Sequence, residues 1–398
     1  MIIKNCKILV DGKLKKVNIQ INGSRIGKIM SDEIIDASDG EIIDLKGKIV
    51  LPGLIDPHVH FREPGLVNKE DFLSGSLAAA KGGITTVLDM PNTVPPTLTV
   101  KLLDDKRKLA SKSVVNYGFH FGSSKNNLPE IKKVKGVASV KIFMDLTTGD
   151  MKIDDKAVLD VMRNSKVVTV HAEGENVKKA VSLINKTKNH LYLCHISTKQ
   201  EIDYLRKNKA SNVSVEVTPH HLFLTTKDEK RLKAYGKMKP GLKSHEDQEA
   251  LWQAIKEGIV DTVGTDHAPH TIEEKEKNGP YGVPGVETML PLLLDAVNKK
   301  RLSLADVQRL CCENPASIFG IKGKGHIKEG YDADLTVVDM NKIEKVVSDK
   351  LLTKSGWSQF EGKLLKGWPV MTIVNGNIVY DNGLVLDIKA KEVKYGIS

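Results

Sequence analysis

The chain has 398 residues and a net charge of +10; 40% of its residues are hydrophobic and 28% are charged. These proportions are typical of a folded globular protein and exclude a collagen, a disulfide-stabilised miniprotein and a disordered tail. The length allows two or three domains, or one barrel of roughly 250 residues with further strands. The lysines are scattered and only 5% of residues are aromatic, so the basic charge indicates a solvated surface and no nucleic-acid partner.

The four cysteines include the adjacent pair Cys311 and Cys312, and their spacing matches neither a secreted disulfide framework nor a zinc knuckle. The N-terminus carries no signal-peptide pattern, and the longest apolar stretch, near residues 288–297, is broken by Pro291 and Asp295. We therefore expect a cytoplasmic protein with reduced cysteines and no membrane partner.

Residues 1–50 and 321–398 alternate β-branched with polar side chains and turn at Asp-Gly, Asn-Gly and Lys-Gly pairs, which predicts antiparallel strands. The segment 3–12 resembles the segment 373–383. We therefore expect both termini to contribute similar hairpins to one small β-sandwich domain.

Between residues 51 and 320, short β-rich runs alternate with helical stretches, a pattern typical of parallel strands joined by helices. Runs such as 84–88, 167–170 and 191–194 are apolar almost throughout, as strands covered on both faces require. The eight runs end near His60, Asn92, Phe121, Met144, Glu173, Ser197, Pro219 and Pro269. Eight such units in roughly 270 residues predict an α/β fold, a TIM (β/α)8 barrel.

Catalytic groups of a TIM barrel lie at the C-terminal ends of its strands. The first run ends with His58 and His60, which point to the same side of an extended chain and can bind one metal ion. The later strand ends supply His171, His195 and Asp266. One histidine at a strand end is usually a hydrogen-bonded core residue, whereas this set of imidazoles with a carboxylate favours zinc.

The fourth run carries Lys141. A lysine repels a cation and becomes a ligand only if CO2 converts its amine to an anionic carbamate, which could bridge two metal ions.

Several stretches resemble the amidohydrolase superfamily and, within it, the dihydroorotase family of cyclic amidohydrolases. They cover residues 58–65, 78–87, 90–93, 194–199, 217–222 and 264–270, and the resemblance extends over nearly the whole chain. The His-x-His pair marks only the superfamily. Arg62 after that pair, Met-Pro-Asn-Thr at 90–93 and Asp-His-Ala-Pro-His at 266–270 are much more specific.

The resemblance implies two zinc ions per chain. One would be held by His58, His60 and Asp266, the other by His171 and His195, with N6-carboxylated Lys141 as the bridge. Some bacterial relatives use a later aspartate in place of the lysine, and Asp145 and Asp150 leave that variant open.

The activity implied is the reversible closure of N-carbamoyl-L-aspartate to L-dihydroorotate plus water, in pyrimidine synthesis. A hydroxide bridging the two zinc ions would attack the ring in the opening direction. Asp266 would act as general acid and base, so pH should set the direction.

Arg62 is placed to bind the substrate carboxylate, because the guanidinium fork matches that group. The resemblance adds Asn92 and His270 as its partners, together with backbone groups near Pro284 and Gly285. Lys239 falls where relatives place another substrate contact.

The loop after Lys141 carries Thr147 and Thr148, whose hydroxyls could reach the substrate from a lid that excludes water. The alternative is an ordinary connection in which a threonine caps the next helix.

Other functions stay open at this stage. A hydantoinase, dihydropyrimidinase or allantoinase would use the same metals on another ring, and a non-catalytic homologue would serve as a scaffold, although no expected ligand is missing. The sequence leaves the oligomeric state open.

Overall fold

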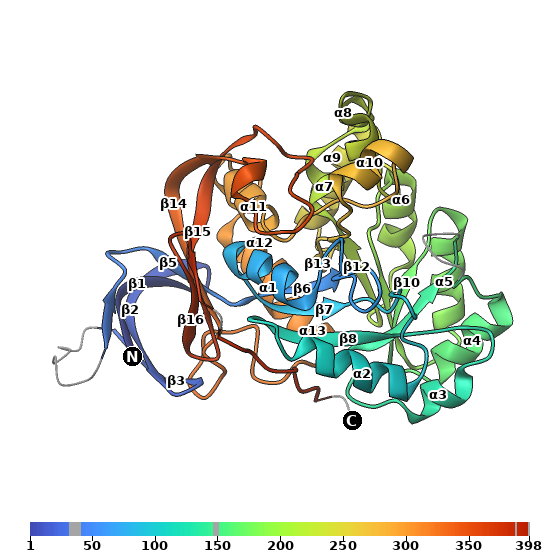
Figure 1. Ribbon diagram of the computed structural model, residues 1–398, viewed down its shortest axis with the longest axis horizontal. Helices are drawn as coiled ribbons and strands as arrows, with labels where there is room; N and C mark the ends of the chain where they lie inside the picture. Colours follow the sequence, from blue (N-terminus) through green and yellow to red (C-terminus); the bar gives the residue numbers. More distant parts are fainter. Residues whose placement is uncertain (32–40, 146–150, 387, 397–398) are drawn as a thin grey trace.

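The computed structural model describes residues 1–31, 41–145, 151–386 and 388–396, which form two sheets (Figure 1). Eight parallel strands follow one another in the order of the chain. They are β6 (Leu54–Val59), β7 (Ile84–Asp89), β8 (Asn116–Gly122), β9 (Ser139–Phe143), β10 (Val167–His171), β11 (His190–Leu193), β12 (Val213–Val217) and β13 (Thr262–Val263). The predicted α/β barrel fold is therefore confirmed.

Backbone contacts between the first and last strand regions bring the two ends of the barrel together. Val59 forms an isolated parallel bridge with His267, and the amide of His60 donates to the carbonyl of His267 at 2.8 Å. Regular pairing of the eighth strand ends at Val263, whereas the predicted run continues to Pro269. Asp266, three residues beyond that point, adopts a left-handed conformation with φ of +46°.

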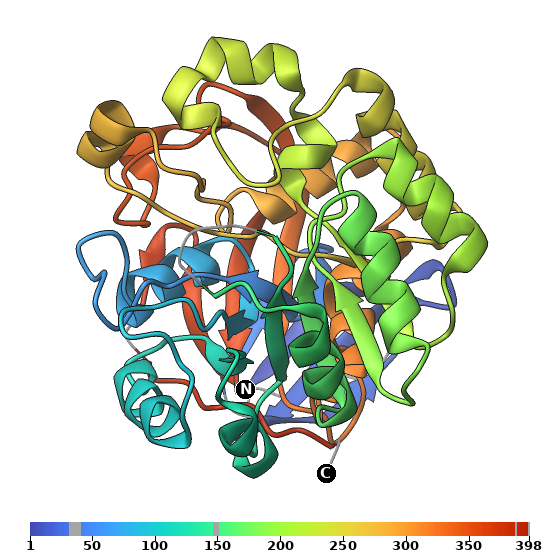
Figure 2. The same ribbon diagram turned by 90° about the vertical axis from the view of Figure 1, so that its right-hand side faces the viewer.

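The helices lie around the barrel strands (Figure 2). They are α1 (Phe72–Lys81), α2 (Val100–Ala110), α3 (Leu128–Lys133), α4 (Asp155–Arg163), α5 (Glu175–Ile184), α6 (Lys199–Asn208), α7 (Pro219–Phe223), α8 (Thr226–Leu232), α9 (His245–Lys256), α10 (Ile272–Asn278), α11 (Met289–Asn298), α12 (Leu304–Gln308) and α13 (Asn314–Ile318), with the short 3-10 helices η2 (Lys233–Gly236) and η4 (Ser348–Lys350) and the π-helix η3 (Arg309–Glu313) between α12 and α13. Among the described residues, no helix combines the length and apolar character needed to cross a membrane.

Helix α6 illustrates how local sequence begins a helix close to the barrel mouth. The hydroxyl of Thr198 accepts from the amide of Glu201 at 3.1 Å, and the Glu201 carboxylate accepts from the amide of Thr198 at 2.9 Å. This reciprocal capping box satisfies amides that lack partners within the helix. Ile202 and Leu205 are buried on the barrel side.

The terminal segments form one mixed sheet, in the order β17-β16-β15-β14-β5-β1-β2-β3 with β4 beside β1. Its strands are β1 (Ile2–Val10), β2 (Lys13–Asn22), β3 (Arg25–Met30), β4 (Ile42–Asp44), β5 (Ile49–Pro52), β14 (Leu335–Lys345), β15 (Leu364–Val374), β16 (Asn377–Asp381) and β17 (Leu384–Val385). In Figure 1 this sheet lies to one side of the barrel. The predicted β domain from both termini is thus present.

The terminal sheet bends round its own apolar core, as a sandwich does. One cluster contains Ile19 and Ile26 from the N-terminal strands together with Leu335 and Ile373 from the C-terminal strands. The domain boundary proposed at residue 50 falls inside β5, which pairs with β1 and β14.

Candidate active site

The pocket at the C-terminal ends of the barrel strands has a volume of about 50 Å³. Most of its lining was predicted from the sequence: His58, His60, Arg62, Asn92, Lys141, His171, His195, Lys239 and Asp266. Phe143, Ala268, Tyr281 and Gly282 complete the lining and were not predicted, since none of them carries a charge or a metal-binding group.

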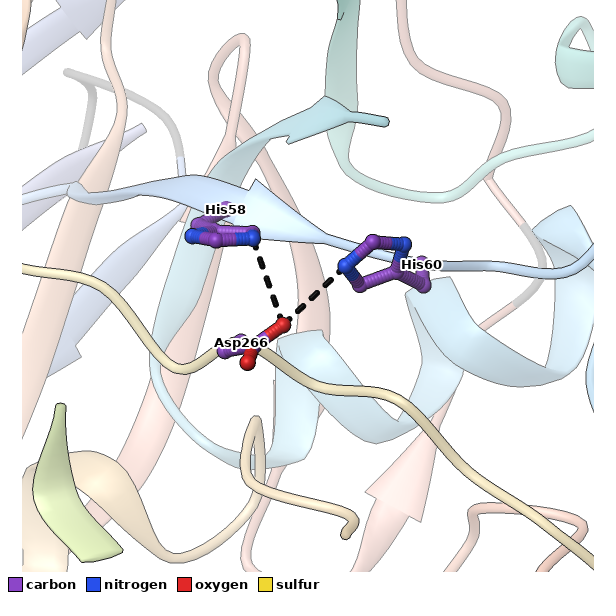
Figure 3. A group of neighbouring side chains, drawn as sticks. All are labelled: His58, His60 and Asp266. Atoms are coloured by element: carbon purple, nitrogen blue, oxygen red, sulfur yellow. Dashed lines mark hydrogen bonds and ion pairs between the residues drawn. The ribbon is translucent and has the colours of Figure 1, made fainter. Parts of the chain in front are cut away.

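His58, His60 and Asp266 converge on one point of this pocket (Figure 3). The Nε2 atoms of His58 and His60 lie 3.2 Å and 3.0 Å from the same oxygen, Oδ1 of Asp266. The left-handed backbone at Asp266 turns its carboxylate toward the two histidines. Two imidazoles and one carboxylate in this arrangement can hold a metal ion.

His171 and His195 form a second group from the neighbouring strands β10 and β11. Nδ1 of His171 lies 2.7 Å from Nε2 of His195. The other ring nitrogen of His195, Nδ1, is buried and has no hydrogen-bond partner among the described residues. Burial lowers the pKa of both histidines, so both imidazoles are neutral at pH 7, the state in which histidine binds metal.

Lys141 lies buried between these two groups on β9. Its Nζ donates to the Sγ of Cys194 at 3.0 Å, and within the described ranges no carboxylate forms an ion pair with it. The carboxylate of Asp145 accepts from the amide of Glu173 at 2.8 Å and from the side chain of Asn176 at 2.7 Å. The Asp145 carboxylate therefore accepts hydrogen bonds from residues at the start of α5, and Asp145 does not line the pocket.

Glu216, on β12, is the main site residue that sequence reasoning missed. It is fully buried behind His58, with Oε1 at 2.8 Å from Nδ1 of that ring. It also accepts from the amide of His195 at 3.0 Å and from the hydroxyl of Tyr192 at 2.7 Å. Burial raises the pKa of Glu216 to about 8. The sequence feature that could have identified Glu216 is its position as the single carboxylate within the apolar run 213–217.

Arg62 forms the cationic side of the pocket and contacts His270 behind it. Nε of Arg62 donates to the carbonyl of Pro269 at 3.1 Å, and Nη2 donates to Nε2 of His270 at 3.2 Å. Burial lowers the pKa of Arg62 to about 10, which leaves the guanidinium charged at pH 7. Asn92 accepts from Nδ1 of His60 at 2.7 Å, so it fixes that ring as well as lining the pocket.

Pro284 and Gly285 lie outside the lining of this pocket. Pro284 and Gly285 line a separate small cavity beside His267. The carbonyl of Pro284 accepts from Nε2 of Gln359 at 2.8 Å, and the amide of Gly285 donates to Nδ1 of His267 at 3.0 Å. Thr147 and Thr148 lie outside the described residues, so the lid stays a prediction.

Comparison with known proteins gives a consistent picture. A model of the amidohydrolase family matches residues 49–379. The chain is 39% identical to a dihydroorotase of Methanothermobacter thermautotrophicus, over 97% of this chain and 95% of that protein. It is 37% identical to a dihydroorotase of Methanosarcina acetivorans, over 95% of this chain and 91% of that protein. Among solved structures, the L-hydantoinase (dihydropyrimidinase) of Arthrobacter aurescens matches with a TM-score of 0.93 at 30% identity, over 99% of both chains.

Proposed function

The chain belongs to the amidohydrolase family and, within it, to the dihydroorotases, and from this premise we propose that it interconverts N-carbamoyl-L-aspartate and L-dihydroorotate in pyrimidine biosynthesis. The observation that carries the proposal is the guanidinium of Arg62 in the lining of the histidine pocket, in contact with His270. A ring that bears a carboxylate requires a fixed cation, and the planar fork of arginine can donate two parallel hydrogen bonds to it.

We infer that two zinc ions complete the site, and the side chains support this inference. One ion is assigned to His58, His60 and Asp266 and the other to His171 and His195, a donor set of the kind zinc prefers. When bound, the ions lower the pKa of water and polarise a carbonyl group.

The surroundings of Lys141 support its assignment as an N6-carboxylated bridge. A buried ammonium group without a carboxylate partner is costly, and the only polar contact of Nζ within the described ranges is the thiol of Cys194. Addition of CO2 to the neutral amine, with loss of a proton, replaces the positive charge by a carbamate anion. That anion can take its place between two cations.

Asp266 holds and moves the proton of the reaction. In ring opening, water adds to the amide carbonyl, and Asp266 takes a proton from the water and gives it to the leaving nitrogen. In ring closing, the same carboxyl group begins in its protonated form. The opening rate therefore rises with pH and the closing rate falls.

The hydantoinase alternative rests on the shared fold and a lower identity. Hydantoin and dihydrouracil lack the carboxylate that Arg62 is proposed to bind. A ring without that group leaves a buried cation unpaired, which weakens binding.

The test is turnover of dihydroorotate by the purified protein, followed by ultraviolet absorbance together with zinc content. We expect conversion in both directions, about two zinc ions per chain, and poor turnover of hydantoin and dihydrouracil. Efficient turnover of either of these in place of dihydroorotate would move the assignment to a hydantoinase or dihydropyrimidinase.

A cytoplasmic location also stays a proposal, and the four cysteines, which are buried and form no disulfide, agree with it.

A further inference from the structure

The connection between β14 and β15, residues 346–363, belongs to the terminal β domain but reaches the mouth of the barrel. In Figure 1 it leaves the sheet and runs toward the barrel helices. Its side chains contact the segments that follow β13, which carry His270, Tyr281 and Gly282. The mechanism proposed above uses no residue of this connection.

Trp357 supports two parts of the pocket at once. Its indole N–H donates to the carbonyl of His270 at 2.8 Å. Its ring lies 5.3 Å from Nζ of Lys275, a buried lysine. That ammonium donates to the carbonyls of Pro280 at 2.7 Å and Gly282 at 3.0 Å, and so fixes the backbone on both sides of Tyr281. Trp357 therefore contacts the group next to Arg62 and the lysine that holds the pocket loop.

Gln359 supports the same loop, residues 279–285, at a position closer to its C-terminal end. Its Nε2 donates to the carbonyl of Pro284 at 2.8 Å, and the side chain is buried. On the same side, the amides of Leu352 and Thr353 donate to Oε1 of Glu287 at 2.9 Å and 3.0 Å. The connection is thus hydrogen-bonded to the loop at several successive points.

Apolar packing gives this contact its rigidity. Trp357 and Phe360 share one buried cluster with Met238 and Val283. Met238 precedes Lys239, and Val283 follows Gly282, and both of these neighbours line the pocket. Displacing the connection would therefore move two loops that face the substrate.

We infer that Trp357 and Gln359 are positioning residues, through which the terminal β domain sets the substrate side of the pocket. The barrel strands set the metal side independently, because His58, His171 and Lys141 lie within β6, β10 and β9. The inference rests on the proposed function, since the substrate side is defined by Arg62 and His270 as the carboxylate site.

The variants Trp357→Phe and Gln359→Met each remove one hydrogen-bond donor and keep most of the apolar volume. Each leaves a loop carbonyl without its partner, so the loop loses its fixed position. We expect KM for dihydroorotate to rise about tenfold, a cost comparable to one unmade buried hydrogen bond. The value of kcat should change less than twofold, and zinc content should match that of the wild type.

Trp252→Phe is the matched control. Trp252 is also buried, and its indole N–H donates at 2.8 Å to the carbonyl of Leu222, away from the pocket lining. This variant should lose similar thermal stability with KM unchanged. An equal rise of KM in Trp252→Phe, or an unchanged KM in both test variants, would overturn the inference.

Amide hydrogen exchange separates this inference from the proposed function, because it requires no turnover. In Gln359→Met, which removes the donor to Pro284, residues 279–285 should exchange faster, while the β10 segment keeps wild-type protection. If the wild type did not convert dihydroorotate, the proposed function would fail, whereas unchanged exchange of residues 279–285 would refute the positioning role alone.

Discussion

Replacement of Glu216 by glutamine or by leucine tests how the carboxylate behind His58 acts. The glutamine carbonyl can still accept from Nδ1 of His58 and from the amide of His195, and its NH2 group can donate to the hydroxyl of Tyr192. That hydroxyl has a second partner, the Oγ1 of Thr262 at 2.7 Å. Glutamine therefore keeps these hydrogen bonds and cannot ionise, but its second amide N–H has no acceptor among these groups.

The two substitutions differ in magnitude. Leucine leaves the His58 ring N–H and the His195 amide without acceptors, at about 1 to 3 kcal/mol each, so Glu216→Leu should lose about 2 to 6 kcal/mol of unfolding free energy. Glu216→Gln should lose only about 1 to 3 kcal/mol in the metal-free protein, for its one unpaired N–H, because the raised pKa of Glu216 favours an uncharged carboxyl that the neutral amide resembles. Its zinc affinity should fall about 10- to 100-fold, since a carboxylate partner strengthens a histidine ligand.

Urea denaturation of the metal-free proteins and chelator competition for zinc measure the two quantities separately. The reasoning would be refuted by a Glu216→Gln variant that binds zinc within twofold of the wild type. It would equally be refuted by a Glu216→Leu variant as stable as the wild type.

Four further changes test other parts of the site. Lys141→Ala should lose most metal and activity, with partial rescue by short carboxylic acids, measured by zinc content and turnover. Asp266→Asn should reduce turnover by several orders of magnitude in both directions while disturbing zinc content less than loss of a histidine does, because an amide cannot carry the proton. Arg62→Lys should raise KM for dihydroorotate strongly and leave zinc content unchanged, because a point charge replaces the guanidinium fork. Lys106→Met should cost about 3 to 5 kcal/mol in urea denaturation, because it leaves Asp89 without its partner; the two groups are fully buried with Nζ 2.5 Å from Oδ2, and unchanged stability would contradict this account.

Local sequence determined the barrel and most of its pocket. The apolar, β-branched runs at 84–88 and 167–170 predicted strands covered on both faces, and they lie within β7 and β10. Because parallel strands end at one face of a barrel, residues at successive strand ends come together without further information. This is why His58, His171 and Asp266 line one pocket as expected.

Only the tertiary structure decided which groups support that pocket. Glu216 lies behind His58 because only the β13 region separates β12 from β6 once the barrel closes, although the two residues are 158 positions apart along the chain. Trp357 reaches His270 from a different domain, across 87 residues. Such contacts form between residues that are distant in the sequence, and they exist only once the sheets have closed. The spacing of apolar residues predicts a strand or a helix, but it does not predict which distant side chains that element will contact.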